Sequence, residues 1–397
     1  MTPPAESHAL RGARRLPAWL LGLGPLVLVT LLVAALFALD LPGLDRRGVP
    51  QEVMAVERTV LRPGVIELHL RNDGADPVRI AQVAVNDAYI PTAQVDPPEV
   101  GRLDGAVARI PYDWIEGEAY EVTLVTATGA TVGAEIEAAV ETPARDAGFF
   151  GLMALLGLYV GIIPVTLGML WLPFVRRVRP ALIRLFMAAT VGLLAFLAVD
   201  ALLEGVETGG TGAQAFGGAG LVLLGALVAY VALSAVDAAV SRRGGASQGM
   251  RLATLVAIGI GLHNLGEGLA IGSAYAVGEL ALGAFLVVGF ALHNTTEGLA
   301  IVAPVAGGSP RLGQLLALGA VAGAPAVLGA WIGGVAFTPP LAALLLGVGV
   351  GAIVQVAVQL LPTLRDPDSG RVMTPLTAGG LTAGVAVMYL TSLMIAG

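Results

Sequence analysis

The sequence contains no cysteine and no lysine, so all 22 basic residues among its 397 residues are arginines. Without cysteine, disulfide bonds, thiolate metal sites and cysteine nucleophiles are excluded. Without lysine, the phosphate-binding loop G-x-x-x-x-G-K-[ST] cannot form, which excludes direct ATP use by that route. Charge is also scarce: 13% of the residues are charged and 56% are hydrophobic, whereas a soluble domain carries about 25% charged residues. The chain is therefore predicted to be an integral membrane protein.

Nine apolar stretches are long enough to cross a bilayer, whose hydrocarbon core of about 30 Å requires about 20 helical residues. The first stretch, 17–39, is separated from the other eight by a long polar segment. The other eight follow in close succession, at 149–175, 181–204, 218–240, 252–275, 281–305, 313–336, 340–362 and 375–396. This pattern predicts a single anchor helix followed by an eight-helix bundle.

The arginines predict the orientation of these helices. Among the short loops they occur in every second one, whereas the short loops at 205–217, 276–280 and 337–339 contain none. Because arginine-rich loops stay in the cytoplasm, residues 1–16 are expected to be a cytoplasmic tail and the C-terminus extracytoplasmic. The stretch 17–39 resembles a secretory signal as well, but its length of 23 residues favours a retained anchor.

Segment 40–146 is then expected to be extracytoplasmic. Alternating runs such as "VIELHLRN" and "YEVTLVTATG", separated by turn residues, predict a small antiparallel β-sandwich. The segment carries 19 acidic residues against 9 arginines. This charge suits either a cation-concentrating antechamber or an ordinary solubilising surface, and the second is the simpler interpretation. His69 alternates with apolar neighbours and is expected to be structural.

A polar motif occurs twice within the apolar region, as "GLHNLGEGLAIG" at 261–272 and "ALHNTTEGLAIV" at 291–302. Positions i and i+4 of a helix lie on one face, so each histidine should sit over its glutamate. If the two motifs face one another at one depth, their side chains form one cluster. Its expected members are His263, Asn264, Glu267, His293, Asn294 and Glu297.

The chemistry of this cluster indicates a metal ion. A charged residue at the centre of a membrane helix costs about 2.5–3.5 kcal/mol, and a micromolar cation site supplies about 8 kcal/mol. Imidazole and carboxylate ligands together suit Zn²⁺, Fe²⁺ and Mn²⁺. Hydrogen bonding between helices is the alternative role for such residues, but a duplicated set of ligands favours metal binding.

The residues "HNLGEGLA" and "HNTTEGLA" resemble the fourth- and fifth-helix motifs of the ZIP divalent-metal transporters, particularly the GufA-like prokaryotic branch. The resemblance covers 148–397. It implies an all-α polytopic bundle of eight helices, here preceded by one transmembrane helix and the β-sandwich. It also implies metal uptake into the cytosol, frequent homodimerisation, and metal ligation by the six motif residues.

The sequence departs from the family pattern in three places. Gly266 and Thr296 occupy the positions where the family usually has proline before the motif glutamate. The sixth family helix commonly carries a glutamate, whereas "AGAPAVLGA" at 322–330 has no acidic residue, and Gln359 replaces a glutamate before "LLP" in the seventh. Because both losses remove negative charge, one metal site is expected rather than a binuclear centre.

Other polar residues lie along the predicted helices. Asp200 is expected to line the outer part of the path, whereas Glu204 is expected to be solvated. Asp237 is expected to pair with Arg242 and Arg243. Gln355 and Gln359, one turn apart, are either uncharged ligands or helix-to-helix hydrogen-bonding groups.

These features predict a transporter of a divalent cation, with Zn²⁺ first and Fe²⁺, Mn²⁺ or Cd²⁺ as alternatives, in a prokaryotic plasma membrane. It is expected to be no enzyme and to hold no prosthetic group, the metal being its substrate. Its expected partners are the metal cation, the lipid bilayer and a second copy of the chain, with no nucleic acid. The alternatives are a metal sensor or scaffold that does not transport and, less favoured, an intramembrane metalloenzyme.

Overall fold

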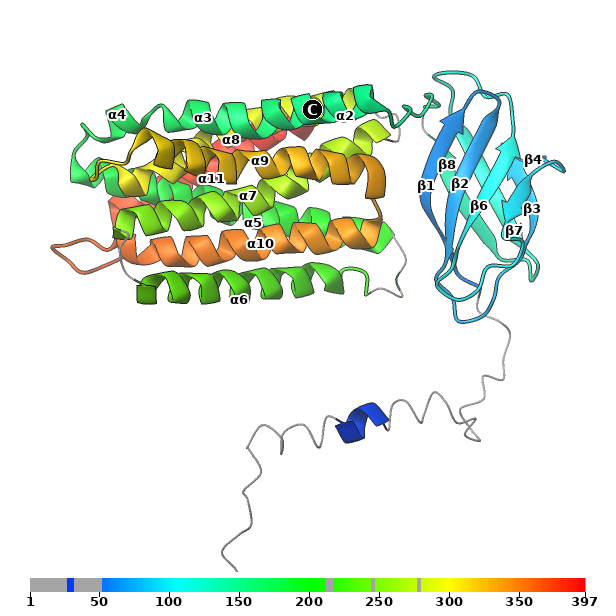
Figure 1. The fold of residues 1–397 in the computed structure, drawn as a ribbon, viewed down its shortest axis with the longest axis horizontal. Coiled ribbons are helices and arrows are strands. Elements are labelled where there is room, and N and C mark those ends of the chain that lie inside the picture. Colours follow the sequence, from blue (N-terminus) through cyan, green and yellow to red (C-terminus); the bar gives the residue numbers. More distant parts are fainter. Residues whose placement is uncertain are drawn as a thin grey trace, which may run out of the picture. The chain divides into compact units, whose positions relative to one another are not determined.

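The computed structural model describes residues 27–31, 52–136, 138–211, 214, 217–243, 247–276 and 280–396. They comprise a β-sheet region and a helical bundle, each of which is described by itself (Figure 1). Within the predicted anchor 17–39, the described residues 27–31 are helical. The rest of the anchor and the predicted cytoplasmic tail 1–16 lie outside the described residues.

The β region consists of two antiparallel four-stranded sheets, which confirms the predicted two-sheet β structure. The first has the order β1 (Met54–Arg62), β2 (Val65–Asn72), β6 (Gly105–Pro111) and β5 (Gln94–Asp96). The second has the order β4 (Ala88–Tyr89), β3 (Ile80–Val85), β7 (Tyr120–Thr126) and β8 (Thr131–Ile136).

Strand β2 illustrates why this sequence forms a sheet. Its side chains alternate between the two faces, and Ile66, Leu68 and Leu70 are buried in the core between the sheets. Gly64, at φ +73°, closes the turn from β1 to β2 in a left-handed conformation that favours glycine. His69 is half-buried between Leu68 and Leu70 in this alternation, so it faces away from the core.

The first span of the bundle is irregular, because it is built from α2 (Ala147–Gly157), the π-helical turn η1 (Leu158–Ile162), α3 (Ile163–Met169) and α4 (Leu172–Val175). The remaining helices are α5 (Pro180–Thr211), α6 (Gly220–Arg243), α7 (Gln248–Ala276), α8 (Leu280–Val302), α9 (Leu312–Ala336), α10 (Pro339–Leu360) and α11 (Pro375–Ala396). The 3₁₀ turns η3 (Ala303–Val305) and η4 (Leu361–Leu364) extend α8 and α10.

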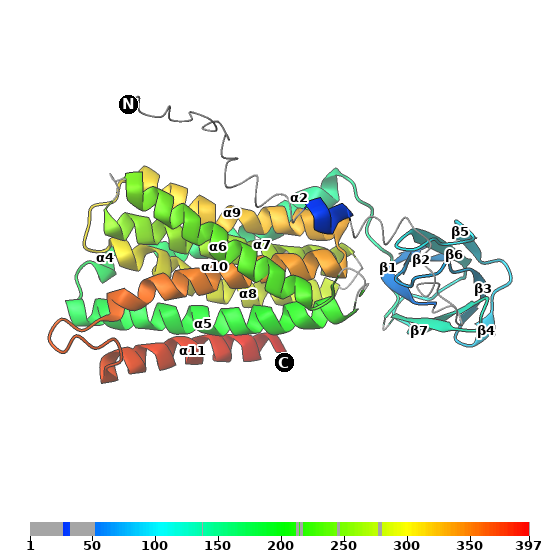
Figure 2. The same ribbon diagram turned by 90° about the horizontal axis from the view of Figure 1, so that it is seen from below.

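Seven helical segments of the described chain are long and apolar enough to cross a membrane. They correspond to seven of the eight spans predicted for the bundle. The eighth, α11, contributes a shorter apolar stretch, Pro375–Leu390, and lies along α5 (Figure 2). The protein is therefore a multi-pass membrane protein by the length and composition of its helices.

Helix α7 is the most enclosed of these spans, and it packs against α8, α9 and α10. Glycines allow this close packing: a Cβ on Gly268 would lie 2.0 Å from the Ala326 carbonyl oxygen, and one on Gly261 would lie 2.3 Å from that of Val321. Helix α8 packs against α3 and α7. Both motif helices are thus held within the bundle by backbone-to-backbone contacts.

Candidate metal centre

Three of the predicted ligands come together between α7 and α8. One ligand atom from each of His263, Glu267 and His293 lies within 4.8 Å of the others. His263 Nε2 is 3.2 Å from Glu267 Oε1, and His293 Nε2 is in direct contact with the same oxygen. All three residues are buried, at 8%, 5% and 4% exposure. A single carboxylate is therefore shared by two imidazoles inside an apolar bundle.

The separation of His263 from Glu267 follows from the helix. The two residues are four positions apart, so their side chains lie one above the other on α7. Two ligands bound to tetrahedral Zn²⁺ at about 2.0–2.1 Å would have donor atoms about 3.3 Å apart, close to the observed 3.2 Å. This pair is thus spaced to ligate one ion.

The motif asparagine of α7 anchors the centre to α9. Asn264 is fully buried and donates from Nδ2 to the Ala322 carbonyl oxygen at 2.9 Å. With Nδ2 committed to the backbone, Oδ1 of Asn264 is left without a donor among the described residues.

The motif asparagine of α8 makes the corresponding contact with the irregular first span. Asn294 donates from Nδ2 to the Val160 carbonyl oxygen at 3.0 Å. Pro164 cannot donate to Val160, as the residue there would in a regular α-helix. Asn294 Nδ2 also donates to Glu267 Oε2 at 2.8 Å, so this asparagine holds the shared carboxylate in place.

Glu297 is buried but stands apart from the three-residue group. It is 0% exposed, and neither of its carboxylate oxygens has a hydrogen-bond partner in the part of the chain that the structure describes. Asn264 and Asn294 likewise have free Oδ1 atoms within the described residues. Buried oxygens without partners are costly, and a bound cation would satisfy them.

The donor set fits a divalent transition metal. Two imidazole nitrogens and a carboxylate oxygen are ligands that Zn²⁺, Fe²⁺ and Mn²⁺ accept, with the oxygens of Glu297, Asn264 and Asn294 as further donors. With both histidines neutral, Glu267 and Glu297 would give the centre two negative charges. A dication would balance this charge in a medium where uncompensated charge is expensive.

Asp200 and Glu204 lie on α5, one turn apart, and both are exposed. Asp200 is within electrostatic range of His263, His293 and Glu267, although it is not a member of the close group. Glu204 is within range of Asp200 and of His263. These carboxylates therefore lie near the centre without being part of it.

Gln355 and Gln359 lie on α10 and have different surroundings. Gln355 is 2% exposed, whereas Gln359 is half-buried and lines a pocket. The Oε1 atoms of both lack a hydrogen-bond partner within the described chain.

The prediction for Asp237 was wrong. It pairs with Arg251 of α7, with Arg251 Nε 2.9 Å from Asp237 Oδ1, rather than with Arg242 at the end of its own helix; the Arg243 side chain lies outside the described residues. Arg242 is exposed, whereas Arg251 reaches Asp237 from the neighbouring helix. The contact joins two helices, and local sequence spacing does not reveal it.

The backbone anchors of the two asparagines were also missed. For Asn294 the signal is Pro164, which lies in an apolar span and cannot donate to the Val160 carbonyl. For Asn264 the sequence offers no comparable signal, since Pro325 deprives Val321 of its donor whereas Asn264 bonds to Ala322. Comparison with known proteins adds no relative: no protein-family model matches the chain, and no curated protein matches it.

Proposed function

We propose that the protein moves a divalent transition-metal cation, Zn²⁺ first, across a membrane through the His/Asn/Glu centre. The observation that carries this proposal is the buried group of His263, Glu267 and His293 among membrane-spanning helices. A group of this kind inside an apolar bundle is costly without a ligand, and a cation at micromolar affinity would supply about 8 kcal/mol.

The direction proposed is uptake into the cytosol across a prokaryotic plasma membrane, without ATP hydrolysis and without enzymatic chemistry. The arginine-bearing loops support this orientation. Alternating access would expose the centre first to one side and then to the other. The close glycine contacts of α7 with α9 support a rigid pair that moves as one body, whereas the few contacts of α6 with α7 leave room for relative movement.

Transport is preferred to a sensing or scaffolding role because polar groups lie near the centre and continue from it along the bundle. Asp200 lies near it on α5, and Gln355 and Gln359 lie along α10. A sensor needs a binding site alone. These polar groups support a path that leads away from the centre along the bundle.

The test is metal uptake into proteoliposomes that contain the purified protein, with Zn²⁺, Mn²⁺, Fe²⁺ and Cd²⁺ compared. The double variant Glu267→Ala, Glu297→Ala should abolish flux, since it removes both buried carboxylates. Asp368→Asn is the matched control, because it removes an exposed loop carboxylate and should leave flux unchanged. Absent flux with metal binding retained in calorimetry would refute transport and support the sensor.

A further inference from the structure

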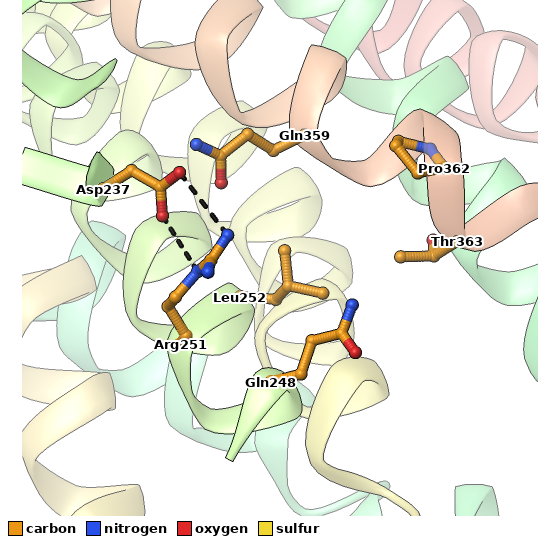
Figure 3. A pocket seen from close by; sticks show the side chains of 7 residues that line it. All are labelled: Asp237, Gln248, Arg251, Leu252, Gln359, Pro362 and Thr363. Carbon is orange, nitrogen blue, oxygen red and sulfur yellow. Dashed lines mark hydrogen bonds and ion pairs between the residues drawn. The ribbon is translucent and has the colours of Figure 1, made fainter. Parts of the chain in front are cut away.

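A pocket of about 270 Å³ lies at the end of the bundle where α6 ends and α7 begins. Its lining comes from α6, α7, α10 and the turn η4, which meet there (Figure 3): Asp237, Gln248, Arg251, Leu252, Gln359, Pro362 and Thr363. The loops at this end carry arginines, which is the end expected to face the cytosol. The pocket is thus a candidate for the inner mouth of the path.

Helix α10 connects the level of this pocket with the level of the metal centre. A Cβ on Gly349 would lie 3.4 Å from His263 Cα, so this part of α10 is opposite the centre. Gly259, one turn earlier on α7, is opposite Ala352 and Val356. Gln355 therefore lies between the level of His263 and the pocket.

Gln359 continues this line by one further turn and reaches the pocket. The Oε1 atoms of Gln355 and Gln359 are both buried and without a partner among the residues described. They form a line of unpaired oxygens along one face of α10, which runs from the centre toward the mouth.

An ion pair lies at the mouth, beside Gln359 (Figure 3). Arg251 binds both oxygens of Asp237, with Nε–Oδ1 at 2.9 Å and NH2–Oδ2 at 3.5 Å. Its NH1 donates to Ser241 Oγ at 2.7 Å, and that hydroxyl donates to the Asp237 carbonyl oxygen at 2.7 Å. The guanidinium is therefore held by groups on α6 in a fixed orientation.

The pair joins two helices that otherwise touch little. Helix α6 packs mainly against α10 and has few contacts with α7. The side chains of Arg251 and Asp237 are 32% and 18% exposed, so water reaches the pair only in part. Opening this link would separate the start of α7 from the end of α6 without disturbing the tightly packed interface of α7 with α9.

We propose that the Asp237–Arg251 ion pair is a latch that closes the inner mouth and opens when a cation leaves the centre. This inference rests on the proposed transport function. A dication that passes Gln355 and Gln359 approaches the Asp237 carboxylate and competes with the Arg251 guanidinium for it. Arg251 is thus a positioning residue that controls access, and it does not ligate the metal.

The natural absence of cysteine allows a direct test. In the full-length protein, Gln359→Cys introduces a single thiol in the pocket, and its reaction with a charged methanethiosulfonate reagent is timed in detergent without metal. Ser309→Cys, in an exposed loop, is the matched reporter for general reactivity. Asp237→Asn is then added, because it keeps the side-chain volume and removes the charge. It should speed labelling of the thiol at position 359 by about five- to tenfold, or about 1–1.4 kcal/mol. Labelling of the thiol at position 309 should stay unchanged.

The charge-reversed double variant Asp237→Arg, Arg251→Asp should restore slow labelling at 359, because it rebuilds the pair. Unchanged labelling in Asp237→Asn would overturn the latch, and so would fast labelling that the reversed pair fails to slow. These rates need neither metal nor flux. If the transport proposal is wrong, the proteoliposome assay will show no metal flux. If the latch proposal is wrong, only the labelling rates will show it.

Discussion

Replacing each motif asparagine with alanine should reveal the asymmetry of the metal centre. Both Asn264 and Asn294 are 0% exposed, and each donates one hydrogen bond to a backbone carbonyl. Only Asn294 also donates to the Glu267 carboxylate, at 2.8 Å. Asn264→Ala is thus a control from within the same chain, with the same residue type, burial and truncation.

The expected difference follows by subtraction. Each substitution removes one amide-to-carbonyl bond and leaves a similar cavity, so these contributions cancel. A hydrogen bond to a charged group contributes about 1.5–3 kcal/mol. Asn294→Ala should therefore lower the free energy of unfolding by about 1.5–3 kcal/mol more than Asn264→Ala does.

The measurement is reversible unfolding by sodium dodecyl sulfate in mixed micelles, without metal, so that ligand loss does not contribute. Metal affinity provides a second readout, because groups that orient a ligand typically affect affinity by about 10- to 100-fold. Equal free energies of unfolding for the two variants would refute the reasoning. They would mean that the bond from Asn294 to Glu267 adds no net stability.

Two further predictions concern packing and pH. Gly168→Ala should destabilise the bundle by about 1–3 kcal/mol, because its Cβ would lie 1.9 Å from the Thr295 carbonyl oxygen. Gly151→Ala is the control, since its Cβ would meet nothing within 4 Å, and it should be neutral in the same detergent unfolding assay. In the loop after α10, the Ser369 backbone N–H and then its hydroxyl hold the pKa of Asp366 below its ordinary value of 3.8. A carboxyl group whose pKa is lower in the folded state than in the unfolded state stabilises the fold at pH values above its unfolded-state pKa. This stabilisation is lost as the pH falls through the folded-state pKa. Hydrogen exchange in 365–374 should therefore show the loop loosening below about pH 4, and Asp366→Asn should remove that dependence; a loop equally protected at pH 3 and pH 6 would contradict it.

The motif arrangement could be predicted from the sequence because it depends on local helix geometry. The i, i+4 spacing places His263 over Glu267, as the structure shows. The β-sheet region was also predictable, since the alternation in β2 is a local pattern.

The asymmetry between the two copies could not be predicted in the same way. The motifs are nearly identical in sequence, yet Glu267 is shared by both histidines whereas Glu297 has no partner among the described residues. The two asparagines also bond to different neighbours, Asn264 to Ala322 of α9 and Asn294 to Val160 of the irregular first span. Tertiary neighbours of this kind lie far away in the sequence.

The proline in the irregular first span has a consequence for how such centres are found in other sequences. Replacing Pro164 with alanine would return a backbone N–H that competes with Asn294 for the Val160 carbonyl. Such a protein would keep both H-N-x-x-E motifs and every ligand, yet the hydrogen bond from Asn294 to Glu267 would change. A search for functional centres should therefore require the distant proline as well as the motif. The span that carries this proline supplies no ligand, yet it helps to orient one.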